Sequence, residues 1–428
     1  MKRNWSRRQF NRLVGVAGAV TAGSIAAPEI VLGQAKAKVV VIGGGAGGGT
    51  VARYIAKDSE DIDVTLVEAN PRYTTCFFSN LYLGGFRTFD SITHSYDTLM
   101  SAYGINVVQA MATGVDTVAK TVALAGGGTL SYDRLVVAPG IDLKNETIDG
   151  YDDAASKFMP HAWKAGAQTQ LLKSQIEAME DGGTFVIAPP PNPFRCPPGP
   201  YERVSMVAHY LKQHKPKSKI LIVDAKNKFS KQKLFEDGWA RFYDGMIEWL
   251  PAEINGGGVK AVDTKSMKIS TADETFTGNV FNVIPAQTAG KIAHAAGLTN
   301  ETGWCPIKPA TMESQLQPDV HLVGDAIIPG DMPKSGFSAN SQAKVCAMAV
   351  RAALTGSKAF KPRFRNTCWS LVATEHGIKV GANYEATEEK IAKTEGFISQ
   401  PEEDDATRAA TAEEANGWYA GMTADIFG

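Results

Sequence analysis

Residues 38–48 read KVVVIGGGAGG, an apolar run that leads directly into a glycine-rich turn. The run is typical of a buried strand, and Gly43, Gly45 and Gly48 fit the spacing G-x-G-x-x-G. In this motif the first glycine permits the tight turn, the second lets the backbone approach a pyrophosphate, and the third packs the helix on the strand. The stretch therefore predicts a strand, a turn and a helix that together bind a dinucleotide.

Two acidic residues farther along the chain indicate which dinucleotide is bound. Glu68 ends a second predicted strand, residues 63–68, where a carboxylate accepts from ribose hydroxyls and favours FAD or NAD over NADP. Asp325 follows another apolar strand, at the place where flavoproteins with two dinucleotide domains hold the ribitol of FAD. Lys334 and Gly336 then stand near the start of a predicted helix whose first amides can face the flavin ring. These residues together favour FAD.

A second strand–helix–strand unit lacks the glycine turn of the first. Strands are predicted at residues 184–188 and 219–224, with a helix at 204–213 between them. The intervening turn reads PPPNPFRCPPGPYER, and its prolines remove amide donors that a pyrophosphate would need. We therefore expect no nicotinamide cofactor in this unit. The loop places Cys196 near the helix start, where the helix dipole would lower the pKa of the thiol, and Glu202 follows as a candidate base.

The chain has five cysteines, too few for a disulfide scaffold. Cys368, in the segment NTCWS, is a candidate partner for Cys196, although spacing alone cannot establish a disulfide between them. Cys76, in TTCFFSN, lies close to the expected flavin, so a thioether to the flavin and a free buried thiol are both consistent with its position. Cys305 and Cys346 are interpreted as structural residues.

The N-terminal residues predict export rather than a part of the fold. Ser6-Arg7-Arg8-Gln9-Phe10 is a twin-arginine pattern, and an apolar stretch from Leu13 to about Ala27 follows it. That stretch is too short and too weakly apolar for a good membrane-spanning helix. We therefore interpret residues 1–35 as a Tat signal peptide and expect a periplasmic protein, in a compartment where disulfides persist.

Composition and motifs indicate a globular protein of several domains and give no support to nucleic-acid binding, a metal site or a haem on this chain. The chain has 428 residues, 44% of them apolar, which suffices for two or three domains. A formal net charge of −1 gives no support to nucleic-acid binding. The sequence holds no C-x-x-C pair, no H-E-x-x-H and no C-x-x-C-H, so we expect neither a metal site nor a haem on this chain.

The predicted fold class is α/β, with two Rossmann-type dinucleotide-binding domains arranged as in glutathione reductase and a C-terminal α+β domain. Residues 129–140 predict a pair of strands within the first domain. The expected domains are 36–150 with 288–355 for a discontinuous FAD-binding domain, 151–287 for a second nucleotide-type domain without a pyridine-nucleotide motif, and 356–428 for the C-terminal domain.

Several long and unusual strings carry a family resemblance that covers essentially all of the chain after the predicted signal peptide. The chain resembles the flavoprotein subunit of flavocytochrome c sulfide dehydrogenase. The strings are TTCFFSN (74–80), APPPNPFRCPPGPYER (188–203), LTNETGWCP (298–306), MPKSGFSANSQAKV (332–345) and NTCWSLVA (366–373). They are far more specific than the glycine turn alone.

The resemblance implies a function and roles for individual residues. It implies that FAD is linked covalently through Cys76 as an 8α-S-cysteinyl flavin, and that Cys196 and Cys368 form a redox-active disulfide over the flavin. It makes Glu202 a candidate base and places Trp418 beside the flavin. Such an enzyme oxidises hydrosulfide to sulfur or polysulfide and passes the electrons to a separate c-type cytochrome subunit in a heterodimer. No membrane insertion is expected.

Two other functions are compatible with the same fold. A sulfide:quinone oxidoreductase would share the chemistry but deliver electrons to a membrane quinone. It should carry apolar, basic amphipathic helices at its C-terminus, whereas the C-terminus here is acidic and mixed. The other alternative is a non-catalytic electron-transfer partner that retains the fold, and failure of sulfide to bleach the flavin would favour it.

Overall fold

The computed structural model describes residues 36–57 and 59–428. Its largest sheet has seven strands in the order β19-β20-β21-β9-β1-β2-β5, and the neighbours from β21 to β5 are parallel. The strands are β1 (Ala37–Ile42), β2 (Ile62–Glu68), β5 (Asn106–Gln109), β9 (Arg134–Val137), β19 (Ile307–Lys308), β20 (Glu313–Ser314) and β21 (Val320–Leu322). The predicted twin-arginine segment lies outside the described residues.

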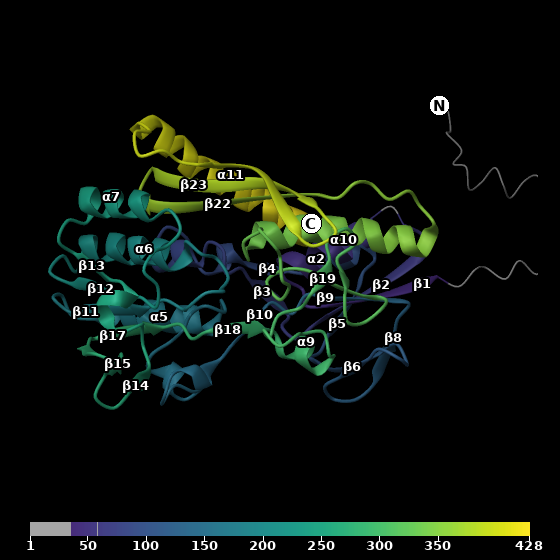
Figure 1. Cartoon of the computed structure of the whole chain (residues 1–428), viewed down its shortest axis with the longest axis horizontal. Helices are drawn as coiled ribbons and strands as arrows, with labels where there is room; N and C mark the ends of the chain where they lie inside the picture. Colours follow the sequence, from purple (N-terminus) through teal and green to yellow (C-terminus); the bar gives the residue numbers. More distant parts are fainter. Residues whose placement is uncertain (1–35, 58) are drawn as a thin grey trace, which may run out of the picture. The chain divides into compact units, whose positions relative to one another are not determined.

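Helix α2 (Ala46–Ala56) follows β1, as the glycine motif predicts, and packs against α10 (Gly336–Thr355) beside the sheet (Figure 1). Gly43 turns the chain with a φ of +96°, and a Cβ there would lie 2.4 Å from the carbonyl oxygen of Ala138. Gly48 lies even closer to its surroundings, because an added Cβ would be 1.8 Å from the carbonyl oxygen of Gly43. The motif is therefore required for the path of the chain as well as for a ligand.

A second sheet has four parallel strands in the order β13-β12-β11-β17. These are β11 (Thr184–Ala188), β12 (Lys219–Val223), β13 (Ile247–Leu250) and β17 (Val280–Val283), accompanied by α5 (Ala167–Ala178), α6 (Gly199–His214) and α7 (Gln232–Phe242). Two connections link this sheet to the first, and they pair with each other as the antiparallel strands β10 (Ile141–Leu143) and β18 (Gln287–Ala289). The α/β fold class with two Rossmann-type units is confirmed, whereas the domain boundaries stay predictions.

The C-terminal part lies across both Rossmann-type units in Figure 1 and contacts elements of each. It is a meander of β22 (Arg363–Ala373), β23 (His376–Ala386) and β24 (Ile391–Ile398), covered on β23 by the long helix α11 (Asp405–Phe427). Strand β22 packs against α6 and α7 of the second unit and against α10 of the first. This strand therefore brings Cys368 to the region where the two units meet.

Smaller elements complete the described chain. They are β3 (Arg72–Thr74), β4 (Thr93–Ser95), β6 (Ala112–Asp116), β7 (Thr121–Leu124), β8 (Thr129–Ser131), β14 (Ala261–Asp263), β15 (Lys268–Ser270), β16 (Thr275–Thr277), α3 (Ser79–Leu83), α4 (Asp97–Tyr103), α8 (Ala252–Asn255), α9 (Lys291–Ala295) and the 3-10 turns η1 (Asp90–Ile92), η2 (Asn145–Thr147) and η3 (Ala155–Lys157). The predicted strand pair at 129–140 is wrong in one respect: β8 pairs with β7, whereas β9 joins the large sheet.

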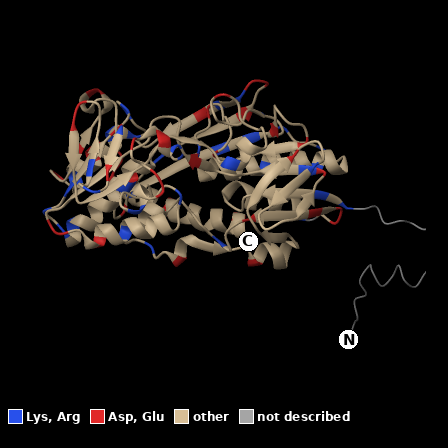
Figure 2. Cartoon of the chain, turned by 90° about the horizontal axis from the view of Figure 1, so that it is seen from below, with Lys and Arg blue, Asp and Glu red and all other residues tan. Residues whose placement is uncertain are grey.

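Basic and acidic residues are interspersed along the ribbon in Figure 2, in keeping with the formal net charge of −1. Within the part of the chain that the structure describes, no helix combines the length and hydropathy that crossing a bilayer requires. The same residues contain no group of three or more His, Cys, Asp or Glu side chains placed to hold a metal ion.

Candidate functional site

A cavity of about 770 Å³ extends over the carboxyl ends of β1 and β2, and we call it the dinucleotide cavity. Its lining includes Gly43 and Gly45 of the turn, Glu68 at the end of β2, and Asp325 after β21. The carboxylate of Glu68 accepts a hydrogen bond of 2.8 Å from the backbone N–H of Gly44, which ties the turn to the neighbouring strand. The volume is within the range of cofactor sites, and the parallel strand ends are where such folds bind ligands.

The residues of the dinucleotide cavity fit FAD. Oδ1 of Asp325 is buried and has no hydrogen-bond partner among the described residues, while Oδ2 faces the guanidinium of Arg195 at 3.6 Å. A buried carboxylate oxygen without a donor is costly, and a ribitol hydroxyl would satisfy it. The turn at Gly45 packs closely on Tyr73, since an added Cβ would lie 2.9 Å from the phenolic oxygen. The predicted cofactor-binding role of Asp325 thus has a physical basis.

A second, smaller cavity of about 90 Å³ adjoins the first, and we call it the thiol cavity. Cys76, Phe77 and Gly336 line both cavities and form their shared boundary. The thiol cavity also exposes the side chains of Cys196 and Cys368, which are far apart in the sequence. A part of a bound molecule that lies at this boundary could therefore contact both the dinucleotide cavity and the thiols.

The structure brings most of the predicted site residues together. Gly43, Gly45, Glu68 and Asp325 line the dinucleotide cavity, Cys196, Glu202, Cys368 and Trp418 line the thiol cavity, and Cys76 and Gly336 line both. Gly48 lines neither cavity and has the packing role described above. Lys334 also lines neither cavity, because its buried ammonium group donates to the backbone carbonyls of Asp325 and Ile327.

Cys196 is held by backbone bonds to two other segments. Its N–H donates to the carbonyl of Lys334 at 2.7 Å, and its carbonyl accepts from the N–H of Gly199 at the start of α6. The residue has a φ of +57°, a left-handed conformation that costs about 1–3 kcal/mol outside glycine. Burial raises the pKa of the Cys196 thiol well above its usual range, and nearby Cys368 and Glu202 raise it further. The expectation of a pKa lowered by the helix dipole is therefore wrong.

Cys368 lies on β22, where alternate side chains point to the same face. Asn366, two residues earlier, donates from Nδ2 to Sγ of Cys368 at 3.3 Å. Oδ1 of Asn366 accepts from the hydroxyl of Ser335, the residue that caps α10. Burial raises the pKa of Cys368, but the Asn366 hydrogen bond opposes this shift. Both Cys196 and Cys368 are free thiols in the structure.

Glu202 projects from the first turn of α6 into the thiol cavity. Its carboxylate accepts from Nδ2 of Asn80 at 2.8 Å and from the backbone N–H of Leu371 at 2.9 Å. Burial raises the pKa of Glu202, while both hydrogen bonds act in the opposite direction. A buried carboxyl with a raised pKa that lines the same cavity as two thiols is a candidate proton acceptor.

Aromatic side chains form part of the wall of the thiol cavity. Trp418 of α11 packs on Trp369 of β22 with ring centroids 5.4 Å apart, and on Phe77 at 5.7 Å. Nε1 of Trp418 is buried and has no hydrogen-bond partner in the part of the chain that the structure describes. An unpaired indole N–H on a cavity wall is a donor that a bound molecule could use.

Three residues at this site were missed by the sequence analysis. Asn80 fixes Glu202, and its own orientation is set by Arg203, whose Nε donates to Oδ1 of Asn80 at 3.0 Å. Lys231 reaches Cys368 from the start of α7, with Nζ 3.0 Å from the carbonyl oxygen. Asn80 belongs to the unusual string at 74–80, which was a usable signal, whereas nothing in the surroundings of Lys231 in the sequence marks it out.

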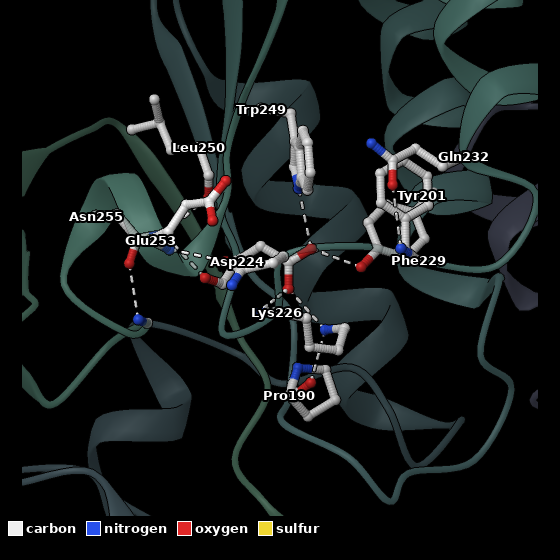
Figure 3. Close-up of polar contacts among 12 residues, drawn as sticks. Pro190, Tyr201, Asp224, Lys226, Phe229, Gln232, Trp249, Leu250, Glu253 and Asn255 are labelled. Atoms are coloured by element: carbon white, nitrogen blue, oxygen red, sulfur yellow. Dashed lines mark hydrogen bonds and ion pairs between the residues drawn. The ribbon is translucent and has the colours of Figure 1, made fainter.

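The second Rossmann-type unit has an acidic residue, Asp224, just after β12, but side chains of the protein already donate hydrogen bonds to its carboxylate. Asp224 is fully buried and accepts from the hydroxyl of Tyr201 at 2.6 Å and from Nε1 of Trp249 at 3.1 Å (Figure 3). Lys226 pairs with the other carboxylate oxygen at 2.6 Å and also donates to the carbonyl of Pro190. The carboxylate that would hold a ribose in a nucleotide domain is therefore saturated by protein groups.

The fold and the site define a class, the flavin-dependent disulfide oxidoreductases with two dinucleotide domains. Residues 37–176 match the family described as pyridine nucleotide-disulphide oxidoreductase. Residues 169–285 match the central part of the sulfide dehydrogenase [flavocytochrome c] flavoprotein chain, and residues 360–427 match the flavin-binding part of flavocytochrome c sulphide dehydrogenase. The match to a flavin-binding family agrees with FAD as the cofactor.

Relatives of known identity narrow this class to one family. Over 43 residues the chain is 51% identical to the sulfide dehydrogenase [flavocytochrome c] flavoprotein chain of Chlorobaculum thiosulfatiphilum, covering 10% of this chain and 90% of that one. The chain belongs to the family of flavocytochrome c sulfide dehydrogenase flavoprotein chains.

Sulfide-quinone reductase and related flavoproteins share the fold. The chain is 34% identical over 103 residues to the sulfide-quinone reductase of Aquifex aeolicus, a match that spans 24% of each protein. The solved structure of the sulfide:quinone oxidoreductase from Aquifex aeolicus superposes with a TM-score of 0.68 at 16% identity, covering 91% of this chain and 92% of that one. A NAD-dependent persulfide reductase from A. fulgidus gives 0.60 at 17% identity, covering 88% and 76%. At such identities the likeness concerns the fold alone.

Proposed function

We propose that this chain oxidises hydrosulfide to sulfur or polysulfide, using FAD in the dinucleotide cavity and a redox disulfide between Cys196 and Cys368. One observation carries the proposal. Two thiols and a carboxyl with a raised pKa line one small cavity, and its boundary residues also line the dinucleotide cavity. Family membership and the names of the relatives support the same substrate.

The cysteine chemistry balances without a further reactant. With the Cys196–Cys368 bond formed, hydrosulfide attacks Sγ of Cys196, a new S–S bond forms, and the electron pair of the broken bond leaves on Sγ of Cys368. The products are a persulfide on Cys196 and a thiolate on Cys368, and the net charge is unchanged. Glu202 accepts the persulfide proton, as its contacts within the cavity permit. FAD, when bound, supplies a two-electron acceptor.

The residues that would hold FAD are those of the dinucleotide cavity. Glu68 would accept from the ribose, Asp325 from the ribitol, and the first turn of α10 at Gly336 would face the ring. Cys76 lines both cavities, and this supports a thioether between its sulfur and the flavin. We propose this covalent link on that placement together with the family resemblance.

We also propose an electron acceptor and a compartment for this chain. A separate c-type cytochrome subunit, joined to this chain in a heterodimer, is the proposed acceptor, in accordance with the flavocytochrome family name. The twin-arginine pattern at residues 6–10 supports Tat export and a periplasmic location. The saturated Asp224 cluster argues against NADH as the reductant that feeds this flavin.

The first experiment is a visible spectrum of the purified protein before and after anaerobic sulfide, followed by acid precipitation. We expect sulfide to bleach the flavin and the yellow colour to stay in the precipitate. Cys368→Ser should abolish bleaching, whereas Cys346→Ala, a change at a buried thiol outside both cavities, should keep it. An unbleached wild-type flavin would contradict sulfide oxidation and favour the non-catalytic electron-transfer partner.

Cys76→Ser separates the covalent link from the sulfide chemistry. We expect this variant to bind FAD but to release it to the supernatant on acid treatment, because the thioether cannot form. Flavin that stays in the acid precipitate of the variant would contradict the link at Cys76.

A sulfide:quinone oxidoreductase is the second candidate, favoured by the match to the Aquifex aeolicus protein. The two candidates differ only in the electron acceptor. Turnover of sulfide with cytochrome c but not with a soluble quinone would support the cytochrome proposal, and the reverse result would support the quinone enzyme.

A further inference from the structure

Lys231 is a buried cation behind the thiol cavity. Only 6% of its surface is exposed, and it stands immediately before α7 with a φ of +61°, in the left-handed region that costs free energy outside glycine. Its ammonium group donates to the carbonyl of Cys368 at 3.0 Å, to Oγ of Ser370 at 2.8 Å and to the carbonyl of Ile378 at 3.4 Å. A lysine is rarely this buried, so both its backbone and its charge call for an explanation.

The charge of Lys231 has no ion-pair partner at hydrogen-bond distance within residues 36–57 and 59–428, because all three acceptors are uncharged. Leaving a cation unpaired in the interior is unfavourable. Burial accordingly lowers the pKa of Lys231 to about 8, and the groups that counteract the shift are Cys368, Glu202 and Cys196. A negative charge that forms in the thiol cavity would therefore stabilise the protonated form of Lys231.

We propose that Lys231 is a positioning residue that stabilises the negative charge on Sγ of Cys368 when its bond to Cys196 opens. The inference rests on the proposed function, in which that bond is broken by hydrosulfide and the electron pair leaves on Cys368. Two features of the geometry carry it. The ammonium is fixed on the backbone of Cys368 and on Ser370 of the same strand, and the second unit supplies the lysine while the C-terminal sheet supplies the thiol.

Other charged or titratable groups act on the same thiols. Lys231 lowers the pKa of Cys368 against the effect of burial, and Glu202 raises it. The remaining groups are Arg195 beside Cys196 in the loop, Arg203 on α6, Cys76 at the cavity boundary and Tyr384 on β23. Arg195 and Arg203 are occupied by the Asp325 carboxylate and by Asn80 with Asn282, respectively. Lys231 is therefore the cation bonded directly to the Cys368 residue.

The test measures thiol ionisation in the reduced holoprotein. Iodoacetamide is reacted anaerobically with the protein over a pH series, and the alkylation of Cys368 is followed by peptide mass spectrometry. We expect Lys231→Met to slow alkylation of Cys368 about tenfold or more at neutral pH, since an adjacent opposite charge shifts a pKa by roughly 1–3 units. The ratio of wild-type to variant rates should shrink above pH 8, where Lys231 itself loses its proton.

Two further variants separate charge from structure. Lys231→Arg keeps a cation and should retain wild-type reactivity at neutral pH, and its reactivity relative to wild type should increase above pH 8. Lys233→Met, on the exposed face of the same helix, should leave Cys368 unchanged. Unaltered alkylation of Cys368 in Lys231→Met, or equal loss in the Met and Arg variants, would overturn the proposal.

Other variants still test the proposal if Lys231→Met does not fold. Lys231→Gln keeps two N–H donors for the strand carbonyls and removes the charge, so it carries the same expectation. If neither folds, the pH dependence of Lys231→Arg relative to wild type decides alone, because a flat ratio across pH 8 would contradict the charge effect. Alkylation of reduced thiols needs neither sulfide nor an electron acceptor, so failure of the proposed function would leave this result readable.

Discussion

At the scale of single residues, the site consists of groups whose ionisation is controlled by their neighbours. Burial raises the pKa values of Cys196, Cys368 and Glu202, while hydrogen bonds to Cys368 and Glu202 and the buried cations Lys231 and Arg203 act in the opposite direction. The balance between these effects decides which group carries a proton during turnover. Glu202 is the group whose role can be tested with the smallest change in shape.

Glu202→Gln should lower the rate of flavin bleaching by sulfide by about 10²–10⁴-fold, the usual contribution of general acid–base catalysis. The base must be ionised, and burial raises the pKa of Glu202, so the wild-type advantage should increase as the pH rises through that pKa. The ratio of wild-type to variant rates is measured at each pH, because the ionisation of sulfide then cancels. Glu180→Gln, at an exposed acid, is the control. A constant ratio would argue against Glu202 as the base.

A site residue could be predicted from the sequence when the residues next to it in the chain form a recognisable pattern. The glycine turn, Glu68 and Asp325 are recognised from residues next to them in the chain, and the structure places all three on one cavity. Cys196, Cys368 and Trp418 come from distant segments, so their proximity rested on the family resemblance. Lys231 acts through a contact across 137 residues of sequence, and no local pattern encodes such a contact.

At the scale of elements, the packing of α2 against the first sheet leaves the least space for larger side chains. The helix begins where the turn folds back on itself, and Gly48 therefore lies against the carbonyl of Gly43. A Cβ added to Gly48 would also lie 3.3 Å from the Cβ of Ala138. The sequence predicted this element closely because each glycine is needed within a few residues of the next. The strands at 129–140 were predicted less well, since hydropathy reports that a strand exists but not which sheet it joins.

Gly48→Ala should therefore reduce both stability and flavin content. The added Cβ would be 1.8 Å from a backbone oxygen, so the turn or the helix must move, and overpacking of this kind costs about 1–3 kcal/mol or more. Gly417→Ala is a matched control, because Gly417 lies within α11 with open space around it, and alanine there should stabilise the helix by about 1 kcal/mol. Thermal unfolding and the ratio of flavin to protein absorbance measure both effects. Full flavin content and an unchanged Tm in Gly48→Ala would contradict the packing argument.

At the scale of the whole described chain, the C-terminal helix fastens the meander to the first unit. Asp425 near the end of α11 pairs with Arg53 of α2 at 3.1 Å and with Lys344 of α10 at 2.6 Å. It also accepts from the hydroxyl of Tyr54 and from Nδ2 of Asn340. Since α11 also carries Trp418, this cluster holds one wall of the thiol cavity in place.

The cluster makes a pH-dependent contribution to stability whose sign can be derived. Burial alone would raise the pKa of Asp425, but hydrogen bonds from Lys344, Asn340 and Tyr54 lower it below its ordinary value. A carboxyl with a lowered pKa in the folded state stabilises the fold above its unfolded pKa, and the contribution is lost as the pH falls through the folded pKa. Asp425→Asn should therefore cost about 1.5–3 kcal/mol near neutral pH, the usual value of charge-assisted hydrogen bonds. In acid the wild type and the variant should converge.

Urea unfolding at a series of pH values measures the difference between Asp425→Asn and wild type directly. Asp405→Asn is the matched control on the same helix, because its pair with Arg241 is solvent-exposed and such pairs contribute little. If the wall argument is correct, Asp425→Asn should also loosen Trp418, which near-UV circular dichroism would report. A stability difference that persists unchanged into acid would mean that the effect comes from packing and not from the charge of Asp425.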